Sequence, residues 1–329
     1  MHSLKKLTLV SMFLAMIVVS LGAYVRLSDA GLGCPDWPGC YGTLTVPQSI
    51  DAIQLAQEAF PESPVEHAKA WKEMIHRYVA GVLGFFILAI AILSSKLKEQ
   101  INFNFKLSFA LVGLVIFQAA LGMWTVTMLL KPIIVSLHLI GGMSVLAILT
   151  YMVHRHYGTH RSSFIKNEFE RSIIRFGLVL IFIQIFLGGW TSTNYAALAC
   201  TDFPTCHGSL IPEMDLFAGF SLNRDLGLGV DGETLSLAAL HGIQWVHRLG
   251  AFVVLLYSFL LVNILRKNQG FSLWSGSLLI IVSLQFIVGI SNLLLHLPIP
   301  LATLHNFLAG LLLMIYVGLN SRITDSWQN

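Results

Sequence analysis

The chain has 329 residues, of which 55% are hydrophobic and only 11% are charged, and its mean hydropathy is +0.73. Because a soluble domain carries about 25% charged residues, this composition excludes an ordinary soluble protein and indicates a membrane protein. The net charge of +3 is small and no basic stripe follows a polar helix, so nucleic acid is not an expected partner.

Eight apolar runs are long enough to cross a bilayer, which takes about 20 mostly apolar residues. In chain order they cover residues 7–25, 74–94, 107–130, 133–153, 173–192, 239–264, 272–295 and 301–319. Two long loops, 26–70 and 194–238, account for most of the remaining chain. The sequence therefore predicts an all-α integral membrane protein with eight transmembrane helices surrounded by the lipid bilayer.

Basic residues gather in the N-terminus and in the second, fourth and sixth connections between the predicted helices. By the positive-inside rule, both termini are expected in the cytoplasm and the two long loops outside. The six residues before the first apolar run do not resemble a transit peptide, so that run is expected to be a retained helix. These features predict a multi-pass protein of a bacterial plasma membrane.

An internal duplication organises the chain. Residues 21–42 align without gaps with residues 187–208, and nine of the 22 positions are identical, including both cysteines. Each half continues with a His-Arg dipeptide and then a Leu-His dipeptide. Since each half contains four predicted helices, an even number, the halves share one orientation, as in the parallel repeats of some transporters.

This duplication predicts two pseudo-symmetric four-helix bundles. The N-terminal bundle is expected to span residues 1–153 and the C-terminal bundle residues 173–329, with a cytoplasmic linker at 154–172. Each bundle is expected to hold one binding site, because ligand sites in bundles are commonly built from side chains on facing helices.

The duplicated histidines are His76, His138, His247 and His305, and we expect all four about 8–10 Å below the outer surface. Ionisable groups inside a membrane are costly and usually functional. Neutral imidazole is the usual axial ligand of haem iron, so each pair is interpreted as a haem iron site. A hydrogen-bonded interior pair is the alternative, and a zinc or copper site is disfavoured because no carboxylate is duplicated beside the histidines.

Small and basic residues near these histidines fit a haem but also fit ordinary packing. The glycines concerned are Gly81, Gly84, Gly141, Gly142 and Gly310. They would leave room for a flat macrocycle or bring helices together. Arg77 and Arg248 stand where haem propionates would point, or they anchor the ends of their helices.

One carboxylate distinguishes the halves. Glu73 lies three residues before His76, whereas Gln244 lies three residues before His247. Residues i and i+3 share a helix face. Glu73 is therefore a candidate proton acceptor or charge stabiliser beside one haem only, the alternative being a surface residue that favours the helix dipole.

Two cysteine pairs, Cys34 with Cys40 and Cys200 with Cys206, lie in the outer loops. Thiols outside the cytoplasm tend to be oxidised, so structural disulfides are the favoured interpretation. A redox role for the first pair and a zinc site built from all four cysteines are the alternatives. The spacing does not fit a covalently attached c-type haem.

Taken together, these residues resemble the haem A synthase family over nearly the whole chain. The resemblance rests on Glu73-x-x-His76-Arg77, His138, His247-Arg248, His305, the two cysteine pairs and the eight-helix duplication. It implies that His76 and His138 lie near the iron of the substrate haem O, and that His247 and His305 ligate a haem B cofactor. It also implies that Glu73 serves the oxidation of the porphyrin C8 methyl group to a formyl group by two successive hydroxylations. A Cys34–Cys40 disulfide would matter to activity or haem transfer.

Two rival functions share part of the pattern. A di-haem b-type electron-transfer protein has the same histidine pairs but leaves the Glu73 and Gln244 difference unexplained. A parallel-repeat transporter would bind its substrate nearer the middle of the membrane. Haem O synthase, cytochrome oxidase assembly factors and a second copy of the chain are the candidate protein partners.

Overall fold

The computed structural model describes residues 1–101, 105–157, 165, 167–268 and 270–323. This part of the chain is all helical and contains no named strand. The long helices are α1 (His2–Leu27), α3 (His67–Lys96), α4 (Lys106–Thr127), α5 (Pro132–Tyr157), α6 (Glu168–Thr193), α8 (Leu237–Lys267), α9 (Ser272–Leu294) and α10 (Ile299–Ile323). Three short elements, α2 (Ile50–Ala59), η1 (Ala196–Leu198) and α7 (Leu216–Gly219), lie in the two long loops.

The eight predicted membrane helices are confirmed, since each long helix is long and apolar enough to cross a bilayer. Most extend beyond their apolar runs; α3, for example, begins at His67 rather than at residue 74. Capping explains two of the starts, because the side chains of Asn167 and Ser236 accept hydrogen bonds from the first turns of α6 and α8. The chain is a multi-pass membrane protein.

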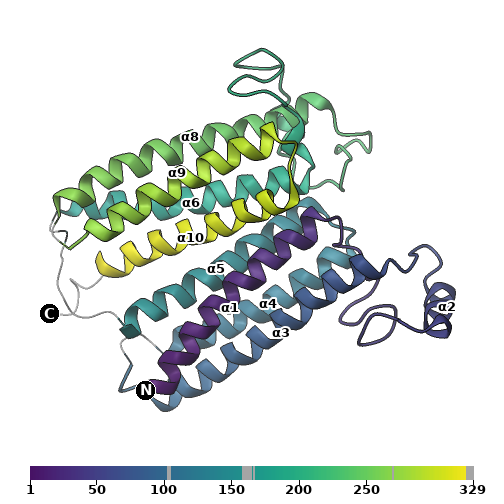
Figure 1. The fold of residues 1–329 in the computed structure, drawn as a ribbon, viewed down its shortest axis with the longest axis horizontal. Helices are drawn as coiled ribbons and strands as arrows, with labels where there is room; N and C mark the ends of the chain where they lie inside the picture. Colours follow the sequence, from purple (N-terminus) through teal and green to yellow (C-terminus); the bar gives the residue numbers. More distant parts are fainter. Residues whose placement is uncertain (102–104, 158–164, 166, 269, 324–329) are drawn as a thin grey trace.

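The helices are arranged as two neighbouring groups of four (Figure 1). Helix α1 packs on α3 and α5, and α4 packs on the same two helices. In the second group, α6 and α9 each pack on α8 and α10. The groups meet where α10 packs on α1 and α5 and where α5 packs on α6. Each group therefore corresponds to one half of the duplicated sequence.

Corresponding residues of the two halves meet at the loop end of α1 and α6. The guanidinium of Arg26 donates to the carbonyl oxygen of Ser192 at 2.9 Å and lies over the ring of Tyr195 at 4.2 Å. The Tyr195 hydroxyl in turn donates to Asp29 at 3.1 Å. Arg26 and Ser192, like Asp29 and Tyr195, are counterparts in the duplication, as expected beside a two-fold axis; the axis itself stays a prediction.

The domain boundaries also stay a prediction. Helix α5 continues to Tyr157 and α6 begins at Glu168, so the proposed linker 154–172 includes the ends of both helices. Its residues 158–164 and 166 lie outside the described part of the chain.

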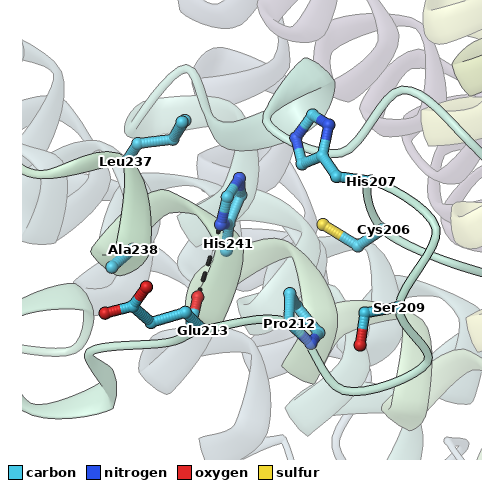
Figure 2. Close-up of a pocket in the computed structure, with 8 residues that line it drawn as sticks. All are labelled: Cys206, His207, Ser209, Pro212, Glu213, Leu237, Ala238 and His241. Atoms are coloured by element: carbon cyan, nitrogen blue, oxygen red, sulfur yellow. Dashed lines mark hydrogen bonds between the residues drawn. The ribbon is translucent and has the colours of Figure 1, made fainter.

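The two long loops repeat the same turn next to their cysteines. The carboxylate of Asp36 accepts hydrogen bonds from the amides of Tyr41 and Gly42, and Asp202 does the same for His207 and Gly208. Tyr41 and His207 share a left-handed backbone, with φ of 54° and 52°. The second loop and α8 also line a cavity of about 300 Å³ (Figure 2).

Candidate functional site

The duplicated histidines occupy one helix each, and they pair within each group. His76 is on α3 and His138 on α5, two helices of the first group. His247 on α8 and His305 on α10 form the corresponding pair. Within the described residues, the buried Nδ1 atoms of His76, His138 and His305 make no hydrogen bond. Each half thus places two imidazoles between its helices, and three of the four keep a ring nitrogen without a hydrogen-bond partner among the described residues.

Every one of these rings lies against a glycine of the neighbouring helix. A Cβ on Gly22 would stand 3.1 Å from Cε1 of His76, and one on Gly122 would stand 3.4 Å from Cε1 of His138. The second half repeats the arrangement, with Gly188 at 3.1 Å from His247 and Gly289 at 3.0 Å from His305. A side chain at Gly22, Gly188 or Gly289 would crowd an imidazole, and one at Gly122 would touch it, so these glycines leave room for all four rings.

The glycines singled out from the sequence have other neighbours. Within the described residues, a Cβ on Gly81 would meet nothing within 4 Å, and one on Gly84 would meet only Val115. Gly141 faces the side chain of Gln118, and Gly142 faces Val19. Gly310 faces Met16 and Leu146, where the two groups of helices meet, so it serves helix packing.

Three of the four glycines that do face histidines follow a glutamine by four residues. The motif is Gln118-x-x-x-Gly122, Gln184-x-x-x-Gly188 and Gln285-x-x-x-Gly289, whereas α1 has Val18-x-x-x-Gly22. The side-chain nitrogen of Gln184 lies 3.0 Å from Nδ1 of His247, and that of Gln285 lies 3.3 Å from Nε2 of His305. Only His76 faces a helix whose motif lacks the amide.

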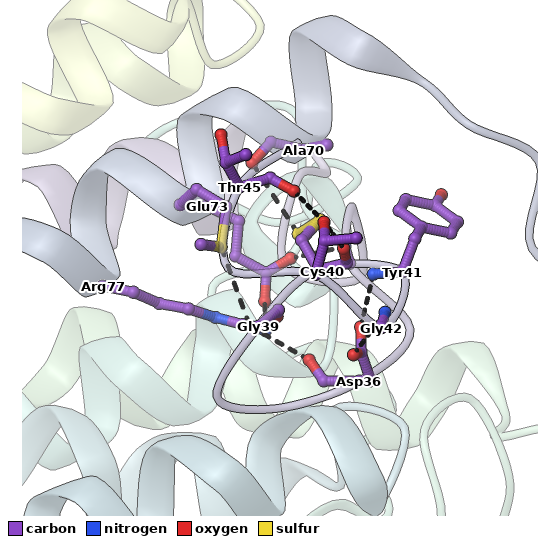
Figure 3. Close-up of a disulfide and its surroundings, with 12 residues drawn as sticks. Asp36, Gly39, Cys40, Tyr41, Gly42, Thr45, Ala70, Glu73 and Arg77 are labelled. Carbon is purple, nitrogen blue, oxygen red and sulfur yellow. Dashed lines mark hydrogen bonds and ion pairs between the residues drawn. A yellow bond between two sulfur atoms is a disulfide. The ribbon is translucent and has the colours of Figure 1, made fainter. Parts of the chain in front are cut away.

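Glu73 is buried and ties α3 to the first loop (Figure 3). One carboxylate oxygen accepts the backbone N–H of Cys34 at 3.0 Å, and the other pairs with Arg77 at 2.6 Å. Arg77 also donates to the carbonyl oxygens of Asp36, at 3.0 Å, and Gly39. The surface interpretation of Glu73 is therefore wrong.

In the second half, the uncharged Gln244 holds the loop to α8 as Glu73 holds the first loop to α3. Its side-chain oxygen accepts the N–H of Cys200 at 2.5 Å, and its nitrogen donates to the carbonyl of Ala197. Arg248 donates to the carbonyl oxygens of Thr205 and Cys200 at 2.8 and 3.0 Å. Both arginines thus anchor a loop to a helix, while the anchoring of helix ends at the membrane interface and a contact with a haem propionate both stay predictions.

Both predicted disulfides are present. Cys34–Cys40 and Cys200–Cys206 each close a loop with a sequence separation of 6, and all four sulfurs are used. A zinc site built from all four cysteines is therefore not formed. Since Glu73 and Gln244 bind the amides of Cys34 and Cys200, each disulfide loop is held at the start of the helix that carries His76 or His247.

Comparison of the sequence with known proteins identifies a family. The family model of the cytochrome oxidase assembly proteins COX15-CtaA matches residues 5–317. A curated relative from Shewanella oneidensis, called Heme A synthase, is 41% identical over 317 residues that cover 94% of each chain. Proteins of the same name from Brucella ovis and Brucella suis are 25% identical over 326 residues, which cover 91% of this chain and 86% of theirs.

Proposed function

The chain belongs to the COX15-CtaA family of cytochrome oxidase assembly proteins, and we propose that it synthesises haem A from haem O. In this reaction the C8 methyl group of the porphyrin would be hydroxylated twice, each time in a two-electron oxidation by an external oxidant, and the geminal diol would lose water to give the formyl group. The observation that carries the proposal is the pair of imidazoles in each half, every ring seated on a glycine. Intramembrane histidines in this number point to haem rather than to packing.

The residues fit haem in both halves. His76 and His138 would bind the iron of haem O among α1, α3, α4 and α5, and His247 and His305 would ligate haem B among α6, α8, α9 and α10. Gln184 contacts Nδ1 of His247 through its amide nitrogen, a donor, so ligation by His247 would require the amide to turn and accept the Nδ1–H, as the neighbour of a ligating histidine normally does. Bound haem B would supply electron transfer.

Two differences between the halves favour the first half as the substrate site. Glu73 supplies a carboxylate where the second half has the neutral Gln244, and proton removal during methyl oxidation requires a base. To act as that base, Glu73 would give up its bond to Arg77 or to the amide of Cys34 and take up the proton instead. Val18 leaves His76 without the amide that Gln184 offers His247, which suits a haem that must leave after reaction.

The proposed location is a bacterial plasma membrane, with both termini in the cytoplasm. The basic connections support this orientation, and the two disulfides suit loops that face an oxidising compartment. Haem O synthase, other assembly factors and a second copy remain the proposed protein partners.

The deciding experiment is to express the protein with a supply of haem O and to identify the extracted haems by mass spectrometry. Formyl-bearing haem A is the expected product. Recovery of unchanged haem O from protein that retains its haem absorbance would instead show an electron-transfer protein. A colourless, iron-free preparation would reject both haem functions and favour a transporter.

A further inference from the structure

The second loop and the start of α8 together carry a group of metal-ligating side chains that has no counterpart in the first half (Figure 2). The sulfurs of Cys200 and Cys206 and a ring nitrogen of His241 all lie within 4.8 Å of one another. The ring of His207 is centred 5.0 Å from that of His241, and both histidines line the cavity beside Cys206. The corresponding residues of the first half are Tyr41 and Ala70, so the duplication does not account for this group.

His241 has the hydrogen-bond pattern of a metal ligand. Its Nδ1 lies 3.3 Å from the carbonyl oxygen of Glu213, so that nitrogen carries the proton. Its Nε2 is buried and, among the described residues, has no hydrogen-bond partner, while the side chain as a whole is only 9% exposed. A carbonyl that fixes the proton on one nitrogen, and so leaves the other with a free lone pair, is typical of ligating histidines. A buried nitrogen without a partner is otherwise costly.

His207 is held in place at the same cavity. Its Nε2 lies 2.9 Å from the carbonyl oxygen of Ala199, and its backbone amide donates to Asp202 at 2.6 Å. With Nε2 as the donor, Nδ1 keeps its lone pair. The loop therefore presents a second imidazole next to His241 and Cys206.

We propose that the dithiol form of this loop binds a single d¹⁰ cation, Zn²⁺ or Cu⁺, through Cys200, Cys206 and His241, and that His207, which lies outside this group of three, moves in as the fourth ligand. Two thiolates and two imidazoles are a common ligand set for such ions. Zinc bonds of about 2.3 Å to sulfur and about 2.0 Å to nitrogen place tetrahedral ligands about 3.5–3.8 Å apart. After reduction the two sulfurs must move apart from bonding distance to about 3.8 Å, and the His241 nitrogen, within 4.8 Å of them, must approach by about 1 Å; the cavity leaves room for the ion.

Metal binding and the disulfide exclude each other at this site. A dithiol donor reduces the Cys200–Cys206 bond by supplying two electrons and two protons, and the donor becomes a disulfide. Zn²⁺ then displaces the two thiol protons, forming two Zn–S bonds. The metal-bound form would thus exist only before the disulfide has formed or after it has been reduced. This proposal does not depend on the proposed haem A synthesis.

Zinc titration of the full-length protein in detergent tests the proposal. The protein is reduced with dithiothreitol, desalted without oxygen and titrated with Zn²⁺ against a coloured chelator. About one Zn²⁺ should bind per reduced chain and none to the oxidised chain. Co²⁺ in place of Zn²⁺ should give thiolate charge-transfer absorption.

Three variants locate the site. His241→Ala should weaken zinc binding at least about 100-fold, and His207→Ala about tenfold. The matched control, Cys34→Ser with Cys40→Ser, removes the other cysteine pair and should bind as the wild type does. His241→Ala changes no cysteine, so both disulfides can still form before reduction. Haem absorbance would report a folding defect in this variant. Equal binding by the oxidised chain or by His241→Ala, or loss of binding in the control, would overturn the proposal.

Discussion

Replacing Glu73 by Gln separates the chemistry of the carboxylate from its part in holding the first loop. Gln244 already shows that an amide oxygen can accept the N–H of the first cysteine of such a loop. Glu73→Gln should therefore keep the bond to Cys34, which is 3.0 Å in the wild type, and lose only the charge that faces Arg77. The variant makes the first half resemble the second at this position.

Glu73→Gln should cost less free energy in the structure of the protein than it adds to the activation free energy of the reaction. The Glu73 and Arg77 side chains are 6% and 12% exposed, so their ion pair is partly desolvated, and a hydrogen bond to a charged group contributes about 1.5–3 kcal/mol. Because Arg77 keeps the carbonyl oxygens of Asp36 and Gly39, we expect the lower end, about 1.5 kcal/mol. That is about a tenfold effect, whereas losing a general base costs about 10²–10⁴-fold in rate.

The assay is the amount of haem A formed per molecule of bound haem O, with thermal unfolding measured on the same preparation. Arg77→Gln is the matched control, because it removes the same ion pair and keeps the carboxylate. We expect Glu73→Gln to bind haem but to form haem A at least about 100-fold more slowly, and Arg77→Gln to lose stability with a smaller loss of rate. If Glu73→Gln retained more than about a tenth of the wild-type rate, Glu73 would not be the base.

Three further changes follow from the contacts of the second half. Gly188→Ala places a Cβ 3.1 Å from His247 and should lower the haem content, measured by the Soret absorbance, whereas Gly276→Ala, which meets no described atom within 4 Å, should leave it unchanged. Gln184→Val copies Val18, removes the partner of His247 Nδ1 and should weaken haem binding in this half about 10–100-fold while shifting the midpoint potential; an unchanged potential would argue against a ligating His247. Hydrogen bonds from Thr205 and Gly208 hold the pKa of the Asp202 carboxyl well below its usual range, so this carboxylate stabilises the loop above about pH 4 and the contribution is lost as the pH falls through the lowered pKa. Thermal unfolding at low pH should consequently depend less on pH in Asp202→Asn than in the wild type.

The sequence predicted the features that composition or local spacing decides. Apolar runs of membrane-spanning length cannot satisfy their backbone in lipid except as helices, so all eight were located correctly. The disulfides followed from two closely spaced cysteine pairs in loops expected to face an oxidising compartment. The short helices α2 and α7 were missed, because neither is long or apolar enough to stand out from its loop.

The sequence did not reveal which glycines face the histidines. Spacing within one helix cannot report which residue of a neighbouring helix lies opposite, so the glycines next to His76 and His138 in sequence were chosen instead. Gly22 and Gly188 already stood in the aligned segments, and the recurring Gln-x-x-x-Gly motif would have identified the other two. The bond from Glu73 to Cys34 was equally hidden, because it joins a helix to a loop 39 residues away.

The duplication makes the departures from symmetry more informative than the shared residues. Both halves keep the histidine pair, the glycines behind it and the disulfide loop, which is the basis for proposing two similar binding sites. The halves differ beside the histidines, where a substrate haem that is released and a cofactor haem that stays bound would need different contacts. Gln184 gives His247 a side-chain partner, whereas Val18 offers His76 only its backbone, and on the proposed assignment this difference favours retention of the haem in the second half. Where the second half has the neutral Gln244, the first half has the charged Glu73, beside the loop that Arg77 binds to α3. On the proposed assignment, one half keeps its haem and transfers electrons, while the other binds, oxidises and releases its own.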